Sequence, residues 1–187
     1  MWIYHGRVIK EGRAWTDDNG VKHPASWSRW TAAEKANAGL VDVTVQPQPD
    51  ARFYWVTGPS IDGTWSSVAR ILEDRAEVDE DGNPLLDEGG VQLVTTGLKT
   101  QYTDQTKQTA NSLLSQTDWQ VIAHAERGRV LDGDVTTYRA AVLASCNAII
   151  DAIAACTTLD AFKLLFDTPV DADGIPVGNP PMSNWPR

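Results

Sequence analysis

The residues that could carry out chemistry are few and are scattered along the sequence. His5, His23 and His124 lie neither four residues apart nor beside a cysteine, so the spacing that binds a metal is missing. His124 and Glu126 are two positions apart in a predicted helix and point to different faces, so a shared acid–base task is not expected. The GxSxG, GxGxxG and Walker patterns are absent from the sequence. We therefore expect no enzyme activity, no metal and no cofactor.

Three acidic segments invite comparison with calcium-binding loops: DDNG at 17–20, DEDGNP at 79–84 and DADGIP at 171–176. An EF-hand loop that starts at Asp79 needs Gly at its sixth position and Glu at its twelfth, but the sequence has Pro84 and Gly90 there, and the loop from Asp171 fails at Ile175. Tight turns also require Asp and Gly. The sequence therefore predicts hairpin turns at these places.

The two cysteines, Cys146 and Cys156, are ten positions apart in one predicted helix, which separates their side chains by about 15 Å along its axis. They cannot pair within that helix. Because there is no CxxC pattern, we expect both to behave as small buried apolar residues.

Charge and hydropathy exclude several classes of partner. The chain of 187 residues carries 16 basic and 25 acidic side chains, giving a net charge of -9 and a pI near 4.7. Its average field repels a phosphate backbone, so we expect no nucleic-acid binding. We find no apolar run close to the roughly 18 residues that cross a bilayer, and the N-terminus lacks the apolar core of a secretory signal. A soluble protein without membrane insertion is expected.

Tryptophan is concentrated in the first third of the chain. Six of the eight lie there: Trp2, Trp15, Trp27, Trp30, Trp55 and Trp65. Indoles fill the cores of small β-rich units and also form the hot spots of interfaces, and both interpretations remain open here. Their flat faces also stack on sugars, which leaves a glycan-binding role as an alternative.

The first half of the chain has the pattern of short strands separated by turns. WIYHGRVIKEG, LVDVTV, RFYWVTG and GVQLVTTG are rich in β-branched and aromatic residues. Between the first two lies TAAEKANAG, in which Thr31 and Glu34 have capping-box spacing and Gly39 offers a stop, predicting a short helix. VARILEDRAEV fits helix or strand, and the Asp-Gly-Asn-Pro turn after it favours a hairpin arm.

From about Lys99 the apolar period becomes helical. One predicted helix follows Thr117 and Asp118, either of which could cap it, and ends at Gly128. The strongest stripe consists of Val135, Tyr138, Val142, Cys146, Ile149 and Ile153. A last helix is predicted from about Thr158 to Phe166. The segment beyond it is too rich in Pro, Gly and Asp to continue as helix.

These elements predict an α+β protein: a Trp-rich β module with one short helix at 1–98, a helical hairpin or three-helix unit at 99–167, and an extended C-terminal tail at 168–187. Composition alone would leave that tail loose. We expect a neighbouring copy in a symmetric assembly to hold it.

The helical half contains the run SLLSQTDWQVIAHAERG, followed by DVTTYRAAV. Its ordered residues Leu113, Leu114, Thr117, Asp118, Trp119, Glu126, Tyr138 and Arg139 resemble the pattern of the C-terminal helical domain of bacteriophage tail proteins and tail-fibre assembly proteins. The resemblance covers about residues 99–153, and the Asn184-Trp185-Pro186 end is similar to Trp-Pro endings of such proteins. The chain departs from the pattern at Ala123, where Arg is more usual, and at Asp132, where Pro often stands. SWSRWTAAEKANAGLVDV is similar to the opening of small tail-associated proteins of marine phages.

The resemblance implies a non-enzymatic virion protein of the phage tail, made in the host cytoplasm, that attaches to tail fibres or assists their assembly. Its implied partners are other tail or fibre proteins and copies of itself. The alternatives are an assembly chaperone absent from the mature virion and a glycan-binding module on the tail. From the helical pattern we further expect Trp119 and Ile122 to pack inward and Glu126 to pair with Arg139. The candidate interaction residues are Trp27, Trp30, Trp55, Trp65, Trp119, Glu126, Tyr138, Arg139 and Trp185.

Overall fold

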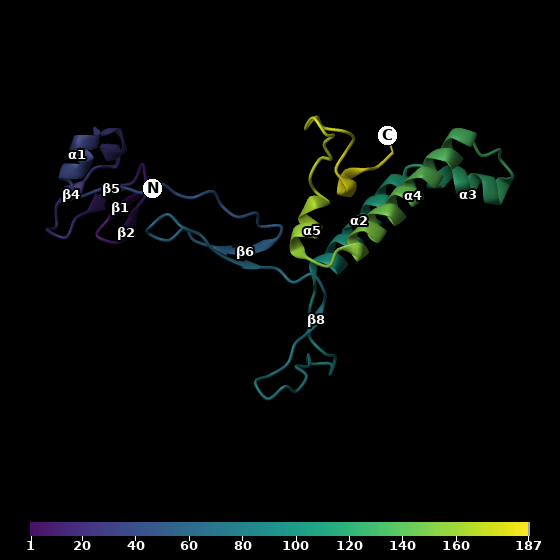
Figure 1. Ribbon diagram of the computed structural model, residues 1–187, viewed down its shortest axis with the longest axis horizontal. Coiled ribbons are helices and arrows are strands. Elements are labelled where there is room, and N and C mark those ends of the chain that lie inside the picture. The colour runs from purple at the N-terminus through teal and green to yellow at the C-terminus, as the bar shows by residue number, and fades with distance from the viewer. Residues whose placement is uncertain (187) are drawn as a thin grey trace. The chain divides into compact units, whose positions relative to one another are not determined.

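The protein is α+β, as its sequence predicts, and a computed structural model describes residues 1–186 (Figure 1). The chain divides into two compact units, residues 1–69 and residues 70–187. The segment 70–98, which its sequence pattern places with the β module, lies in the second unit with the helices. Each unit has a core of its own and is described separately.

The first unit is built from short strands, one 3-10 helix and one short α-helix. Its elements are β1 (Trp2–Tyr4), β2 (Arg7–Ile9), β3 (Trp15–Thr16), β4 (Lys22–His23), the 3-10 helix η1 (Ala25–Arg29), α1 (Ala32–Asn37), β5 (Val41–Asp42), β6 (Tyr54–Thr57) and β7 (Ser66–Ala69). β1 lies between β2 and β5 in an antiparallel sheet, in which Ile3 faces Val8 on one side and Val41 on the other. The pairs β3–β4 and β6–β7 form antiparallel hairpins.

Tryptophan side chains form much of the first core. Trp27 is fully buried, and its indole N–H donates to the Arg13 carbonyl at 2.8 Å. Tyr4, Ile9, Trp15 and Leu40 complete the buried cluster, with Trp2 and Trp30 packed against it. The core interpretation of the tryptophans is therefore confirmed for four of the first six.

The capping box predicted for α1 is confirmed. The Thr31 hydroxyl accepts from the Glu34 amide at 3.3 Å, and the Glu34 carboxylate accepts from the Thr31 amide at 2.7 Å. The predicted stop at Gly39 has φ of +76°, and a Cβ there would meet the Tyr4 ring at 3.1 Å. Glycine is required at this position for both reasons.

The second unit is a helical assembly with a β arm. Its elements are β8 (Arg75–Ala76), β9 (Val94–Thr95), α2 (Leu98–Ser115), α3 (Asp118–Arg127), α4 (Gly133–Ala155), α5 (Leu159–Leu164) and the 3-10 helix η2 (Pro181–Ser183). The chain before the arm supports the start of α2: the Ile71 and Leu72 carbonyls accept from the Leu98 and Lys99 amides. Asp74 accepts from the Gly97 amide at 2.7 Å. These bonds occupy amides that a helix N-terminus leaves free.

The helices α2 and α4 run side by side in opposite directions (Figure 1). The predicted stripe of α4 is buried at Val142, Cys146, Ile149 and Ile153, and half-buried at its first two positions. The buried residues of α2 recur every four positions: Leu98, Tyr102, Thr106 and Ala110. Such matched stripes are how antiparallel helices pack.

The short helix α5 closes one end of this pair with aromatic contacts. Phe162 is fully buried, with its ring centroid 5.5 Å from that of Tyr102 and 5.7 Å from that of Phe166. Thr158 caps the helix by accepting from the Ala161 amide at 3.1 Å. The last predicted helix is thus confirmed with a slightly shorter extent.

All three acidic segments form turns, and a fourth turn of the same construction follows at Asp87. In each, the first carboxylate accepts from the amides two and four residues later, and a glycine with positive φ stands three residues on. The turns start at Asp17, Asp79, Asp87 and Asp171. This is the turn chemistry that the sequence predicts at the three segments.

The C-terminal tail is folded back on its own unit, which corrects the expectation that it needs a neighbouring copy. The Met182 amide donates to the Leu165 carbonyl at 3.0 Å. Trp185 packs against the cluster of Ala110, Val142 and Cys146 between α2 and α4. The Trp185 indole therefore holds the C-terminal tail, whose composition predicts a loose segment, against the helix pair.

Within residues 1–186, α4 has the length and composition of a membrane span, with mean hydropathy of 1.3 over 18 residues. This differs from the expectation that no segment of the chain is apolar enough to cross a bilayer. The core helix of a soluble protein has the same properties, and here α4 lies along α2, which carries Lys99, Asp104 and Lys107. Inserting this pair into a bilayer would expose those charges to lipid. Absence of membrane insertion stays a prediction.

Candidate interaction surface on helix α3

Helix α3 follows α2 after a tight corner. Thr117 stands at its N-cap position but does not cap it, because the Thr117 hydroxyl donates to the Leu114 carbonyl at 3.1 Å instead. Asp118 lies in the first turn, where the helix dipole favours a negative charge. The predicted end at Gly128 is confirmed, with φ of +63°.

Arg139 of α4 ties this corner together. Its Nη1 donates at 2.8 Å to each of three acceptors: the Leu114 carbonyl, the Thr117 hydroxyl and the Asp118 carboxylate. The Arg139 side chain is only 23% exposed. The expected pairing of Glu126 with Arg139 is therefore wrong, since the guanidinium is occupied at the opposite end of α3.

The outer face of α3 is apolar and open to solvent. Trp119 is 61% exposed and Ile122 is 53% exposed, so the expectation that they pack inward is wrong. They are three residues apart and share one face, and α3 has no buried residue at all. These side chains are exposed because α2 ends at Ser115, before α3 begins, and so does not cover this face.

His124 and Glu126 do not form a catalytic pair. The His124 Nδ1–H donates to the Arg129 carbonyl at 2.6 Å, which fastens the chain leaving α3. Glu126 is exposed, seven residues after Trp119 and hence on the same helical face. His124 therefore holds the C-terminal end of α3, and Glu126 lies on its exposed face.

The other candidate interaction residues have different environments. Trp27 is fully buried and belongs to the core, and Trp30 packs against the same core. Tyr138 and Trp185 pack on the cluster between α2 and α4. Trp65 is half-buried, with its indole donating to the Gln46 carbonyl at 2.8 Å. Trp55 is 62% exposed and faces Val68 across the β6–β7 hairpin.

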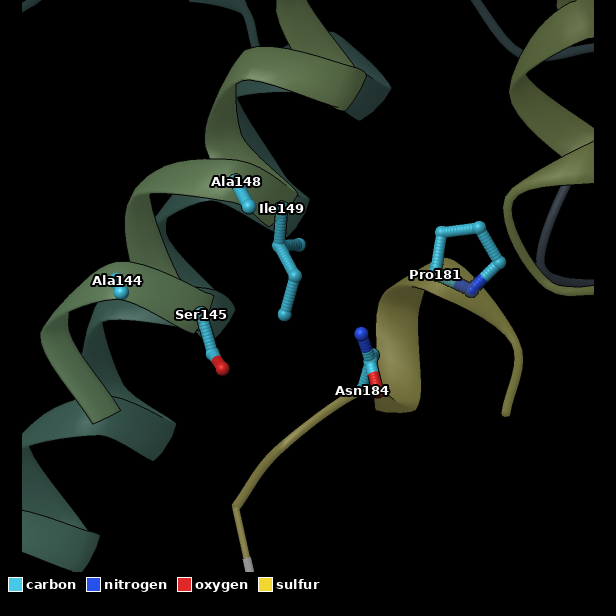
Figure 2. Close-up of a pocket in the computed structure, with 6 residues that line it drawn as sticks. All are labelled: Ala144, Ser145, Ala148, Ile149, Pro181 and Asn184. Carbon is cyan, nitrogen blue, oxygen red and sulfur yellow. The ribbon is translucent and has the colours of Figure 1, made fainter. Parts of the chain in front are cut away.

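A hollow of about 330 Å³ lies between α4 and η2, and Figure 2 shows its six lining residues. They are Ala144, Ser145, Ala148, Ile149, Pro181 and Asn184, none of which ionises near neutral pH. Elsewhere, burial raises the pKa of the Cys156 thiol, although Lys99 acts to lower it. A protonated buried thiol is a poor nucleophile. Among residues 1–186, no group of three or more His, Cys, Asp or Glu side chains is arranged to hold a metal ion.

The arm, residues 74–96, has an organisation that the predicted strands do not include. Glu77, Leu85 and Leu93 are spaced by eight, and their amides bond in a closed ring: Glu77 to the Leu93 carbonyl, Leu93 to that of Leu85, and Leu85 to that of Glu77, at 2.8 to 2.9 Å. The sequence contains a signal for this arrangement, because VDEDG at 78–82 recurs as LDEGG at 86–90. Two copies of one turn thus fold three short segments against each other.

Comparison with protein-family models, with curated proteins and with solved structures finds no match to this chain.

Proposed function

We propose that this chain is a non-enzymatic component of a bacteriophage tail that attaches to tail fibres or assists their assembly through protein–protein contacts. The observation that carries the proposal is the open apolar face of α3, where Trp119 and Ile122 lie side by side on a helix with no buried residue. The phage context rests on the resemblance of the Thr-Asp-Trp and Tyr-Arg pattern to tail proteins.

The polar residues of that pattern and its tryptophan have separate tasks. Thr117, Asp118 and Arg139 hold the corner from which α3 starts. The corner fixes the direction of α3 and so presents Trp119 on a rigid support. A rigidly presented indole loses little entropy on binding, which makes it a strong anchor at an interface.

The geometry favours a partner with an apolar groove that receives one helix face. Helix-in-groove recognition uses anchors at i, i+3 and i+7, and these positions are Trp119, Ile122 and Glu126. The first two supply apolar area. Glu126 supplies a charge at one end, which a Lys or Arg of the partner would complement.

The test uses particles of the phage that encodes the chain. Mass spectrometry of purified particles should find the chain at a fixed ratio to the fibre protein. The double variant Trp119→Ala, Ile122→Ala should be incorporated about tenfold less or lower, because losing one hot-spot side chain alone removes about 2 kcal/mol of binding. The matched control is Arg127→Ala, an exposed residue of α3 away from that face. Equal incorporation of the double variant and the wild type would overturn the proposal.

The same measurement decides between component and chaperone. A chaperone would bind fibre protein in assembly intermediates through the same face and be absent from finished particles. The glycan alternative rests on Trp55, the other strongly exposed indole among the candidates. It predicts a signal on a glycan array that Trp55→Ala removes and Trp119→Ala leaves unchanged.

A further inference from the structure

The arm lacks any core of its own. No side chain from residue 74 to 96 is buried, and six large apolar residues are 39 to 64% exposed: Val78, Leu85, Leu86, Val91, Leu93 and Val94. Exposed apolar side chains gathered in one short segment are often covered by a partner.

The charge of the arm restricts what that partner can be. The arm has one cation, Arg75, which pairs with Glu77 at 3.4 Å, and seven carboxylates: Asp74, Glu77, Asp79, Glu80, Asp81, Asp87 and Glu88. Asp79 and Asp87 accept from turn amides, and Glu77 accepts from the Thr95 hydroxyl. Within residues 1–186, the Glu80, Asp81 and Glu88 carboxylates make no hydrogen bond or ion pair, and all three are exposed. Two arms would repel each other, so the arm needs a cationic surface.

The first unit offers such a surface. A hollow of about 360 Å³ lies along β2 and β3, with Arg7, Lys10 and Arg13 around an apolar wall of Val8, Ile9, Ala14 and Trp15. Arg7 donates to the Thr16 carbonyl at 2.7 Å, while the exposed Lys10 and Arg13 side chains make no bond within residues 1–186. Glu11, the acid between them, accepts from the Trp2 indole at 3.1 Å. We name this hollow the basic hollow.

Trp15, which lines the basic hollow, has an indole donor that is buried beneath the surface. The Trp15 residue is 9% exposed, and its indole Nε1 is buried without a hydrogen-bond partner. A buried N–H that finds no acceptor is costly and rare. Three cations gathered at one place in a chain of net charge -9 make the basic hollow suited to carboxylates.

We propose that the acidic arm of one copy docks on the basic hollow of a second copy. Glu80, Asp81 and Glu88 then lie opposite Arg7, Lys10 and Arg13, and Leu85 and Leu86 cover the apolar wall. The two surfaces differ, so each copy accepts one neighbour and donates to another, which builds a ring or an open row. The inference rests on the proposed role in assembly, but uses neither Trp119 nor Ile122.

Sedimentation velocity of the full chain over a concentration series tests this contact. We expect association that grows with concentration and weakens at least tenfold as NaCl rises from about 50 mM to about 500 mM. The arm variant Glu80→Lys, Asp81→Lys, Glu88→Lys should be monomeric, because its three unpaired carboxylates become lysines, which the basic hollow repels, and the arm loses its net negative charge. The hollow variant Lys10→Glu, Arg13→Glu should be monomeric, because its arm and hollow are both acidic. An equimolar mixture of the two should associate again.

The matched control is Asp173→Lys, which reverses a charge at the same position of the tail turn as Asp81 holds in the arm. It should associate like the wild type. A wild type that is monomeric throughout, reversed variants that associate normally, or a mixture that stays monomeric would each overturn the contact. Because the variants keep the α3 face, their incorporation into particles tests the proposed function separately.

Discussion

At the scale of single residues, Arg139 shows how a motif residue acquires its role from geometry. Glu126 and Asp118 are both on α3, and sequence spacing permits either to meet Arg139. Asp118 is the partner because the carbonyl at the end of α2 and the Thr117 hydroxyl lie beside it. Three acceptors converge on one guanidinium, an arrangement that suits the charge and donors of arginine.

Replacing Arg139 should weaken the second unit measurably. Arg139→Met is expected to lower the free energy of unfolding by about 2 kcal/mol, because it leaves the Asp118 carboxylate and two further acceptors without their donor. Urea denaturation followed by circular dichroism at 222 nm gives the value. Arg127→Met, on an exposed part of α3, is the control and should change stability by less than about 0.5 kcal/mol. Equal losses would show that the corner does not stabilise the unit.

A second residue-scale prediction concerns Asp62. Hydrogen bonds from the Ser60 and Thr64 side chains and from the Thr64 amide lower its pKa from 3.8 to about 2. The folded state thus favours the carboxylate, so its contribution to stability is complete above pH 4 or so and is lost as pH falls towards 2. Ser60→Ala should raise the Asp62 pKa towards 3.8 in a carbon-detected NMR titration. Ser67→Ala, outside this turn, should leave the Asp62 pKa unchanged.

At the scale of elements, local signals were predicted well and long-range contacts were not. The capping box of α1, the Gly128 stop and the apolar stripe of α4 depend on nearby residues; the first two were found, and four of the six stripe residues are buried. Trp119 and Ile122 have the spacing of a buried stripe, but that spacing does not reveal that α2 has already ended. Likewise, the composition of the tail does not reveal that Trp185 reaches a helix pair over 30 residues earlier in the chain.

The end of α3 at Gly128 supports a prediction at the scale of elements, in which Gly133 is the comparison. Gly128 and Gly133 both have open space where a Cβ would stand, but only Gly128 has a positive φ. Gly128→Ala should therefore destabilise the second unit by about 1 kcal/mol, whereas Gly133→Ala, in the first turn of α4, should be neutral or stabilising by about 0.5 kcal/mol. Thermal unfolding followed by circular dichroism compares the two. A larger loss for Gly133→Ala would contradict the assigned conformations.

At the scale of the whole molecule, the two units have cores of different chemistry. The first is assembled from indoles around Trp27, and the second from aliphatic stripes closed by Phe162. The sequence shows both compositions but not the boundary, because residues 70–74 look like the preceding strands and yet supply acceptors for the start of α2. Two of these three acceptors are the backbone carbonyls of Ile71 and Leu72, which composition cannot disclose, and the third is the Asp74 carboxylate.

Separate cores predict separate responses to core substitutions. Trp27→Ala and Phe162→Ala each remove a fully buried aromatic side chain and should cost about 3 to 5 kcal/mol. In hydrogen exchange followed by mass spectrometry, Trp27→Ala should raise exchange in residues 1–69 and leave α2 and α4 protected, and Phe162→Ala should do the reverse. Because the two changes are matched in kind and burial, each is the control for the other. If either variant exposed both units equally, the chain would unfold as one cooperative body, and the loss of an indole core would then also disrupt the corner that presents α3.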